Sequence, residues 1–156
     1  MAVAMTVQQY LSDNGIEYDT VSHPPTQSSM GTAQSSHVMS DRIAKGVLLR
    51  TEDAYLLAVL PASRHIRLGE LGTWLNESLG LATEKEITEL FTDCELGAVP
   101  AVGAAYGLDV VIDDNLVMQS DVYFEGGDHT TLVHLTADNF RKALGDAPHA
   151  EFSVQG

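Results

Sequence analysis

The chain has 156 residues, 44% of them hydrophobic and 19% charged, so its length and composition suit one domain with an ordinary core. Its formal net charge of −14 argues against broad contact with nucleic acid, because binding along the phosphate backbone requires many cations. A single cysteine, Cys94, excludes both an internal disulfide and a zinc site built from cysteines. The N-terminal residues lack the features of a signal peptide, and no stretch approaches the ~20 apolar residues of a membrane span, so we expect a cytoplasmic protein without a membrane partner.

The first half of the chain predicts a helix, a strand, a polar loop and a strand pair. Val7 and Leu11 recur at helical spacing, and Asn14-Gly15 supplies a C-terminal stop. Two later apolar runs are joined by three polar residues, and this spacing predicts an antiparallel hairpin. In chain order the elements are a helix at 5–14, a strand at 17–21, a loop at 26–40 with a short helix near 32–37, and hairpin strands at 42–50 and 54–60.

The second half predicts further helices and short strands. Thr83 and Glu86 have the spacing of a capping box, which marks the start of a helix. Gly126, Gly127 and Asp128 form a turn between two strands. In chain order the elements are helices at 68–75 and 83–91, a small-residue loop at 97–103, strands at 110–112, 122–125 and 130–135, and a helix at 138–144.

Helices and strands are mixed without a strict strand–helix–strand order. We therefore predict an α+β fold, in which a single compact domain over residues 1–156 has a mixed, mostly antiparallel sheet flanked by helices. The core should extend over about 5–145. The last dozen residues carry little pattern and are predicted to be loose.

Lys45 is the most informative residue of the chain. It lies inside the apolar run 43–49, although the chain has only eight Lys and Arg. A strand alternates faces, so Lys45 shares a face with Ile43 and Val47. An ammonium group there must reach solvent, find a partner or line a pocket. Lys45 is thus a candidate for holding an anion or a carbonyl group, and the alternative is that it lies at the exposed end of the strand.

Two loops are further candidates for ligand binding. The small residues at 97–103 let the backbone approach a ligand, and their N–H groups can bind a carbonyl oxygen. His129 stands where a turn leads into a strand, a position from which its ring can face a pocket. An ordinary tight connection and a solvated turn histidine are the alternatives.

Several other enzyme classes lack their signatures in this sequence. It has no Gly-x-Ser-x-Gly elbow, no phosphate-binding glycine loop and no dinucleotide fingerprint. The histidines have no paired metal spacing, and a hairpin turn explains the acids near His129 at least as well, so we predict no metal site and no cofactor. Cys94 lies between Asp93 and Glu95, whose negative charge disfavours the thiolate that a nucleophile needs.

Most of the basic residues are concentrated in one part of the chain. Five of the eight fall between positions 42 and 67, namely Arg42, Lys45, Arg50, Arg64 and Arg67. If the strands bring them together, they form a small basic patch that suits the end of a nucleic acid better than a long duplex, so we expect no DNA partner. The alternative is that they are solvated edge charges.

The order of these pieces resembles a known family, the YbaK and prolyl-tRNA synthetase-associated domains, which are free-standing aminoacyl-tRNA editing deacylases. The resemblance extends from the helix at 5–14 to the helix at 138–144. Its carriers are Ile43-Ala44-Lys45, Leu60-Pro61-Ala62, Leu96-Gly97-Ala98-Val99-Pro100 and Gly127-Asp128-His129-Thr130.

The resemblance implies a barrel-like mixed sheet and hydrolysis of the ester that joins a wrong amino acid to the tRNA 3′ end. Lys45 matches the family's pocket lysine, which holds the terminal nucleotide or the ester. His129 is similar to a histidine that some members place beside the pocket. The water would be activated by the tRNA's own 2′-hydroxyl, which fits the missing catalytic triad. The matching substrate-binding loop comprises Gly97, Ala98, Val99 and Pro100, and we add Gly103 at its far end.

Two positions depart from the family pattern. Leu96 stands where the loop usually has its first glycine. Gly46 follows the lysine, where some alanine-clearing members carry a polar residue. The amino acid that is removed therefore does not follow from the resemblance.

We predict an aminoacyl-tRNA deacylase that acts in trans, without a metal, on the 3′ end of tRNA mischarged with a small amino acid. The alternative is a non-catalytic module that uses the same pocket for a small ligand or a protein partner. A basic rim around Lys45 would favour tRNA, and an acidic rim would favour the module.

The small number of cations predicts that tRNA binding depends only weakly on salt. The counterion-release slope should correspond to about two to four phosphates, because few basic side chains can touch the backbone. The affinity for mischarged tRNA can be measured by fluorescence anisotropy as KCl is raised. Tight binding of bare, uncharged tRNA at physiological salt would contradict this expectation.

Overall fold

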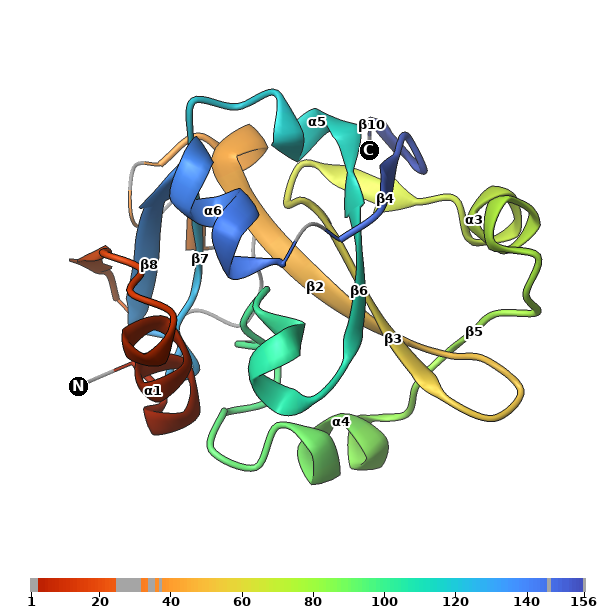
Figure 1. Cartoon of the computed structure of the whole chain (residues 1–156), viewed down its shortest axis with the longest axis horizontal. Helices are drawn as coiled ribbons and strands as arrows, with labels where there is room; N and C mark the ends of the chain where they lie inside the picture. The colour runs from red at the N-terminus through yellow and green to blue at the C-terminus, as the bar shows by residue number, and fades with distance from the viewer. Residues whose placement is uncertain (1–2, 25–31, 34–35, 37, 146, 156) are drawn as a thin grey trace.

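The computed structural model describes the chain except for residues 1–2, 25–31, 34–35, 37, 146 and 156, and it contains short helices around a mixed sheet (Figure 1). The helices are α1 Met5–Asp13, α3 Leu68–Leu75, α4 Glu84–Leu90, α5 Asp114–Val117 and α6 Ala137–Ala143, with 3₁₀ turns η1 Ser40–Arg42 and η2 Gly103–Tyr106. The strands are β1 Asp19–Ser22, β2 Ile43–Arg50, β3 Tyr55–Pro61, β4 Arg64–Ile66, β5 Gly80–Leu81, β6 Asp109–Asp113, β7 Asp121–Glu125, β8 Thr131–Thr136, β9 His149–Ala150 and β10 Ser153–Gln155. Within the described residues, no helix has the length and apolar character needed to cross a membrane.

Eight strands form one mixed sheet with the β2–β3 hairpin near its centre. The main strand order is β1-β8-β7-β2-β3-β6-β9, and β5 also pairs with β2. β2 and β3 are antiparallel, with Lys45 opposite Leu60, whereas β2 is parallel to β7 and β3 is parallel to β6. A separate two-stranded sheet joins β4 to β10. Figure 1 shows β2 and β3 crossing the molecule diagonally between α1 and α3.

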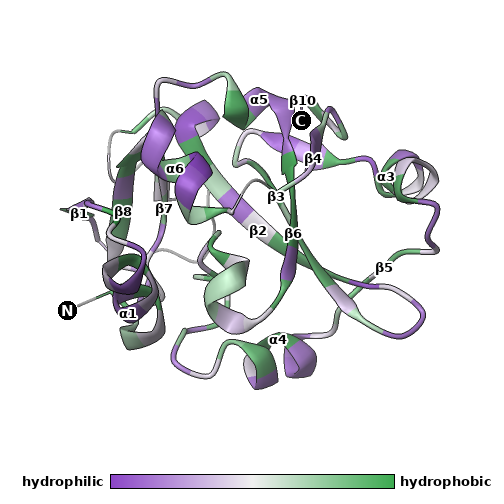
Figure 2. Cartoon of the chain, viewed as in Figure 1, coloured by the Kyte–Doolittle hydropathy of each residue, from purple (hydrophilic) through white to green (hydrophobic). Residues whose placement is uncertain are grey.

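The sheet buries side chains on both of its faces, as β3 illustrates. Leu57 and Val59 pack with side chains of α1 and α6, while Ala58 and Leu60 pack with α3 and with Phe152. Because successive strand side chains point to opposite faces, burial on both sides explains the unbroken apolar run of β3. Figure 2 shows hydrophobic residues along β8 and β3 and hydrophilic residues over much of α6.

The structure confirms the predicted fold class, a mixed α/β domain whose sheet is flanked by helices. The predicted helices at 5–14, 68–75, 83–91 and 138–144 correspond to α1, α3, α4 and α6. Thr83 and Glu86 form the predicted capping box, in which each side chain accepts a hydrogen bond from the other residue's amide. The predicted loop over 26–40, with its short helix, lies largely outside the described residues.

The C-terminal end differs from the sequence expectation of a loose tail. Residues 149–155 include two paired strands, β9 beside β6 and β10 beside β4. Phe152, between them, is 2% exposed and packs in the cluster beneath α3. Its amide donates to Asp113 and its carbonyl accepts from the Arg67 amide. These contacts are made with residues far away in the sequence, so no local periodicity indicates them.

We expect the Phe152→Ala substitution to lower the free energy of unfolding by about 3–5 kcal/mol, as for other buried aromatic truncations. Urea unfolding followed by circular dichroism measures this change. Gln155→Ala, at an exposed position of β10, is the control and should have little effect. Equal stability of the Phe152→Ala and wild-type chains would show that the C-terminal end is not part of the core.

Candidate functional site

A small cavity lies where β2 and β7 part. The two strands pair at Ile43 with Tyr123 and at Ala44 with Phe124, and then separate. Further along the same edge of β2, the next paired residue is Leu49, whose partner strand is β5. The cavity measures about 120 Å³. The described residues that line it are Ala44, Lys45 and Gly46 of β2, Glu125 of β7, Ile87 of α4, and Gly97 and Val99.

Lys45 is half-buried at this cavity. Its ammonium group has one hydrogen bond, a long contact of 3.5 Å to the Ala62 carbonyl, and no carboxylate of the described chain forms an ion pair with it. Burial lowers the pKa of Lys45 below the usual lysine value. Ala62 is itself held in place, because its amide donates to the Ile43 carbonyl at 2.8 Å. Lys45 is therefore a cation with donor capacity left for a ligand.

The backbone of Gly46 also faces the cavity. The Leu48 carbonyl accepts from the Ala82 amide on the β5 side of β2, so alternate residues of the strand turn their N–H and C=O groups to that side. Gly46 is two residues from Leu48 and thus presents its backbone groups where β7 has already left the strand. This edge can donate a hydrogen bond to a carbonyl oxygen next to Lys45.

Only some of the predicted residues of the 97–103 loop lie at the cavity beside Lys45. Gly97, with φ of 88°, and Val99 line the cavity. Ala98 and Pro100 are buried and are not among the described lining residues. Gly103 is required for packing, because a Cβ there would lie 2.7 Å from Val110 Cγ2.

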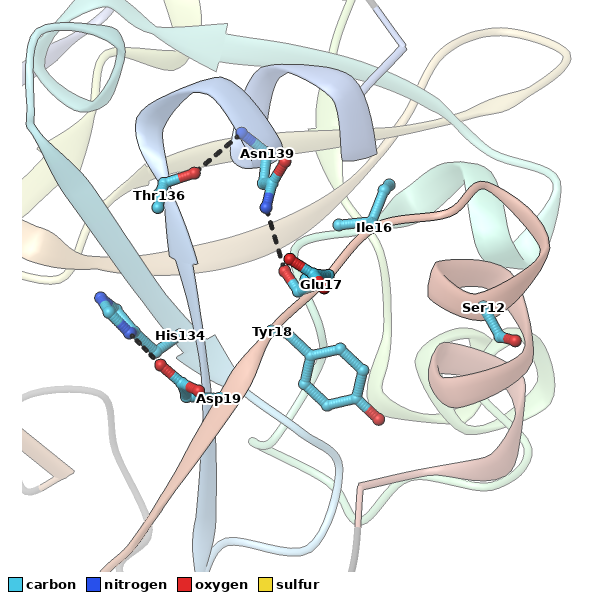
Figure 3. Close-up of a pocket in the computed structure, with 8 residues that line it drawn as sticks. All are labelled: Ser12, Ile16, Glu17, Tyr18, Asp19, His134, Thr136 and Asn139. Atoms are coloured by element: carbon cyan, nitrogen blue, oxygen red, sulfur yellow. Dashed lines mark hydrogen bonds and ion pairs between the residues drawn. The ribbon is translucent and has the colours of Figure 1, made fainter.

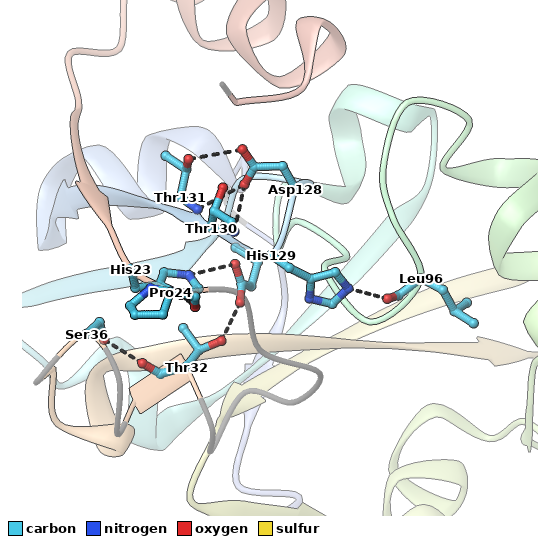
Figure 4. A network of polar contacts seen from close by, with 10 residues as sticks. His23, Pro24, Thr32, Ser36, Leu96, Asp128, His129, Thr130 and Thr131 are labelled. Carbon is cyan, nitrogen blue, oxygen red and sulfur yellow. Dashed lines mark hydrogen bonds and ion pairs between the residues drawn. The ribbon is translucent and has the colours of Figure 1, made fainter. Parts of the chain in front are cut away.

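His129 is close to the loop but does not line the cavity. Its Nε2 hydrogen bonds to the Leu96 carbonyl, which can only accept, so this nitrogen carries the proton (Figure 4). The other ring nitrogen, Nδ1, is buried without a hydrogen-bond partner in the described part of the chain. The residue has a left-handed backbone, with φ of 62°. Through this hydrogen bond to Leu96, His129 holds the loop in position next to Gly97.

The turn that contains His129 is itself well anchored. The Gly127 carbonyl accepts from the Glu95 amide at 2.7 Å, which ties the start of the loop to the turn. Asp128 accepts from the amides of Thr130 and Thr131 (Figure 4). Partial burial opposes ionisation of Asp128, but these hydrogen bonds outweigh it and lower the pKa of the carboxyl group. The turn thus positions the loop through two consecutive residues, Glu95 and Leu96.

Glu125 is a cavity residue that the sequence analysis missed. It is 4% exposed, and its carboxylate accepts from the Thr32 hydroxyl at 2.5 Å and lies 3.4 Å from His23 Nε2. The Nδ1 of His23 donates to the Pro24 carbonyl at 2.8 Å. In the sequence, Glu125 is the last residue of an apolar strand, directly before a Gly-Gly turn, and it resembles an ordinary turn acid. Burial was the only signal that could have singled it out, and that depends on the fold.

Cys94 has the environment of an unreactive thiol. Burial raises the pKa of Cys94 to about 11, although its hydrogen bond with the Tyr106 hydroxyl acts in the opposite direction. The Tyr106 hydroxyl in turn donates to Asp93 at 2.8 Å. A raised pKa disfavours the thiolate that a nucleophile needs, so we continue to expect no catalytic role for Cys94.

The basic patch that the sequence allowed, with solvated edge charges as its alternative, is largely neutralised by acidic side chains. Three of its arginines form ion pairs, Arg42 with Asp121 at 3.0 Å, Arg50 with Glu86 at 3.2 Å and Arg67 with Glu70 at 2.8 Å. Arg64 hydrogen bonds to Ser153 of β10. The cavity itself is lined by one cation and one carboxylate among the described residues, so its rim is neither basic nor acidic.

A larger surface hollow of about 650 Å³ is lined by a different set of residues from the small cavity (Figure 3). Its polar groups mostly satisfy one another: Asn139 donates to the Glu17 carbonyl, and the Thr136 hydroxyl caps α6. His134 contacts Asp19 and Asp121. The described part of the chain contains no group of three His, Cys, Asp or Glu side chains arranged to hold a metal ion. None of the predicted site residues is among the described residues that line this hollow.

Comparison with known families identifies the class of protein. The sequence pattern of the aminoacyl-tRNA editing domain matches residues 23–143, a range that includes Lys45, the 97–103 loop and His129. The chain therefore belongs to the aminoacyl-tRNA editing domain family, and the resemblance seen in the sequence is confirmed. A search of curated proteins gives no match.

Several solved structures share the fold. The hypothetical protein APE2540 has a TM-score of 0.84 at 20% identity, covering 96% of this chain and 99% of that chain. A protein assigned as a trans-editing enzyme for prolyl tRNA synthetase has a TM-score of 0.84 at 23% identity, covering 98% and 99%. A protein from Marinobacter aquaeolei VT8, assigned to signal transduction, has a TM-score of 0.80 at 21% identity, covering 98% of this chain but 31% of that chain. At these identities the likeness shows the fold alone.

The burial of Lys45 predicts an unusual titration. Its pKa should lie below the ordinary lysine value of ~10.4, so folding disfavours the charged form and the free energy of unfolding should rise as the pH increases through the folded-state pKa. Carbon-detected NMR of the lysine side chains measures the midpoint, and loss of one signal in Lys45→Met assigns it. An unshifted midpoint for that signal would mean that the ammonium group is fully solvated.

Proposed function

We propose that the chain is an aminoacyl-tRNA deacylase that hydrolyses, in trans, the ester between a wrong small amino acid and the tRNA 3′ end. The observation that carries the proposal is that Lys45, Gly97 and Val99 line one small cavity in a member of the editing family. The cavity of about 120 Å³ is well below the ~300 Å³ at which pockets enclose drug-sized ligands, so it suits a short aminoacyl group. A cytoplasmic location follows from this role.

The cavity supplies groups for each part of an ester hydrolysis. Water adds to the ester carbonyl carbon, and the bond from that carbon to the tRNA oxygen breaks. The released tRNA oxygen takes up the proton that the water loses and becomes a free hydroxyl, while the amino acid leaves as the carboxylic acid. The Lys45 ammonium and the Gly46 N–H face the place where negative charge develops on the carbonyl oxygen. The backbone at Gly97 and Val99 positions the aminoacyl group, and the neighbouring hydroxyl of the terminal ribose orients the water.

The paired arginines support contact with the acceptor end alone. Arg42, Arg50 and Arg67 already have acidic partners, so few cations are available for the tRNA backbone. The runner-up function, a non-catalytic module that binds a small ligand or a protein, uses the same cavity. A deacylation assay against a panel of mischarged tRNAs distinguishes the two, because the module would release no amino acid from any of them.

Substitution of the pocket lysine should remove activity without unfolding the chain. We expect Lys45→Ala to reduce kcat/KM for the best substrate of the panel by about a hundredfold or more, as for loss of one oxyanion donor. His129→Ala should have a milder effect, because His129 braces the loop from outside the cavity. Lys142→Ala, an exposed lysine on α6, is the control. Unchanged turnover in Lys45→Ala, with circular dichroism like that of the wild type, would count against the assignment.

If a hydroxyl of the substrate activates the water, deacylation should not require a metal ion. Activity should persist in EDTA, and it should fall sharply when the free hydroxyl of the terminal ribose is replaced by hydrogen. Single-turnover rates with the two substrates measure the effect. If chelation abolished turnover, or if the deoxy substrate reacted normally, substrate-assisted hydrolysis would have to be abandoned.

A further inference from the structure

The two strands that border the cavity supply one charged side chain each. Ile43 and Tyr123 are paired across β2 and β7 and pack in the same hydrophobic cluster, so they lie on one face of the sheet. Lys45 and Glu125 are each two residues further along their strands and therefore project toward that same face. Both line the cavity, but from strands that have separated.

The two charges do not neutralise each other directly. Within the described residues, Lys45 has no carboxylate oxygen within 4.0 Å, and the group that lies near Glu125 is His23. A buried carboxylate is costly without hydrogen bonds, and among the described residues Glu125 has one contact on each oxygen, from Thr32 and His23. A carboxylate has about four acceptor positions, so Glu125 keeps acceptor capacity for a further donor in the cavity.

The contact with His23 leaves Glu125 able to accept hydrogen bonds from a ligand that is a strong donor, such as an ammonium group. The Pro24 carbonyl can only accept, so Nδ1 of His23 carries a proton and donates to it. The remaining nitrogen, Nε2, faces Glu125 at 3.4 Å, which is long for a hydrogen bond and attractive only if a proton lies between the two groups. An ammonium ion from a ligand can donate to the same carboxylate at a shorter distance.

An aminoacyl ester carries the two groups that this cavity can recognise. Its ester carbonyl accepts hydrogen bonds, and its α-ammonium group, one carbon away, donates them. Lys45 and the Gly46 N–H are donors for the carbonyl, and Glu125 is the acceptor that remains for the ammonium. We infer that Glu125 recognises the free α-ammonium group of the substrate, and so restricts the site to aminoacyl esters whose amine is unblocked. This inference rests on the proposed function and names a specificity determinant of the same site.

The first test uses the wild-type chain and the mischarged tRNA that it hydrolyses best. The same tRNA is chemically N-acetylated, which removes the positive charge and keeps the ester. We expect kcat/KM to fall about ten- to a hundredfold with the acetylated substrate, as for loss of one charge-assisted hydrogen bond. Equal hydrolysis of the two esters overturns the inference without any variant being made.

The second test assigns the discrimination to Glu125. Glu125→Gln keeps an acceptor for the Thr32 hydroxyl but removes the charge. The variant should raise KM for the free-amine ester about ten- to a hundredfold and leave the acetylated ester almost unaffected. Glu89→Gln, an exposed glutamate on α4, is the matched control and should retain the wild-type preference.

The outcomes separate the inference from the proposed function. An equal loss on both esters in Glu125→Gln, with the fold intact, means that Glu125 serves the structure or the chemical step and overturns its role in recognition. If the wild-type chain hydrolyses none of the mischarged tRNAs in the panel, the proposed function is wrong, and the inference that rests on it is wrong as well. If the wild-type chain is active but hydrolyses the acetylated and free-amine esters equally, the inference is wrong and the proposed function stands.

Discussion

The cavity depends on one constraint, namely that β2 and β7 pair over two residues and then separate. The parallel register ends at Ala44 and Phe124. If the ladder continued, Lys45 and Glu125 would lie side by side on one face of the sheet, and an ion pair would fill the space. Separation of the strands instead leaves a cation and an anion apart on the walls of one cavity, with backbone groups of Gly46 between β7 and β5. This arrangement exposes polar groups that a closed sheet would satisfy, and it is therefore retained at a cost in stability.

The two sides of the cavity belong to different units of the fold. Lys45 is part of the β2–β3 hairpin, whose seven paired positions make it the longest ladder of the sheet. Glu125 belongs to β7 and leads directly into the turn at 126–130. That turn accepts from the Glu95 amide and donates through His129 to the Leu96 carbonyl, so the loop that carries Gly97 is attached to it. The turn therefore helps to set the positions of both the loop and Glu125.

The sequence was sufficient for most of the regular elements, because these leave local signals, and it also draws attention to Lys45. A scarce cation inside an apolar run is conspicuous at any position, and period-two and period-3.6 patterns mark β2, β3 and α1. Glu125 has no such signal, since a carboxylate before a Gly-Gly turn is ordinary until the fold buries it. The packing of Phe152 was missed for a related reason. Its partners belong to or adjoin β4, β6 and α3, which are far away in the sequence, so no local pattern indicates the contact. The small residues of the loop were expected to let the backbone approach a ligand, but for Gly103 the group that lies close is the Val110 side chain.

The two hydrophobic clusters are completed at different points of the chain, and this has a consequence for cleavage. The cluster on the α1 and α6 face has Leu144 as its last buried member, whereas the cluster under α3 requires Phe152. A chain cut by a protease between these two residues would keep every buried member of the first cluster and lose Phe152. The face of β3 that Phe152 covers would then be open to water, and a surface of this kind promotes aggregation.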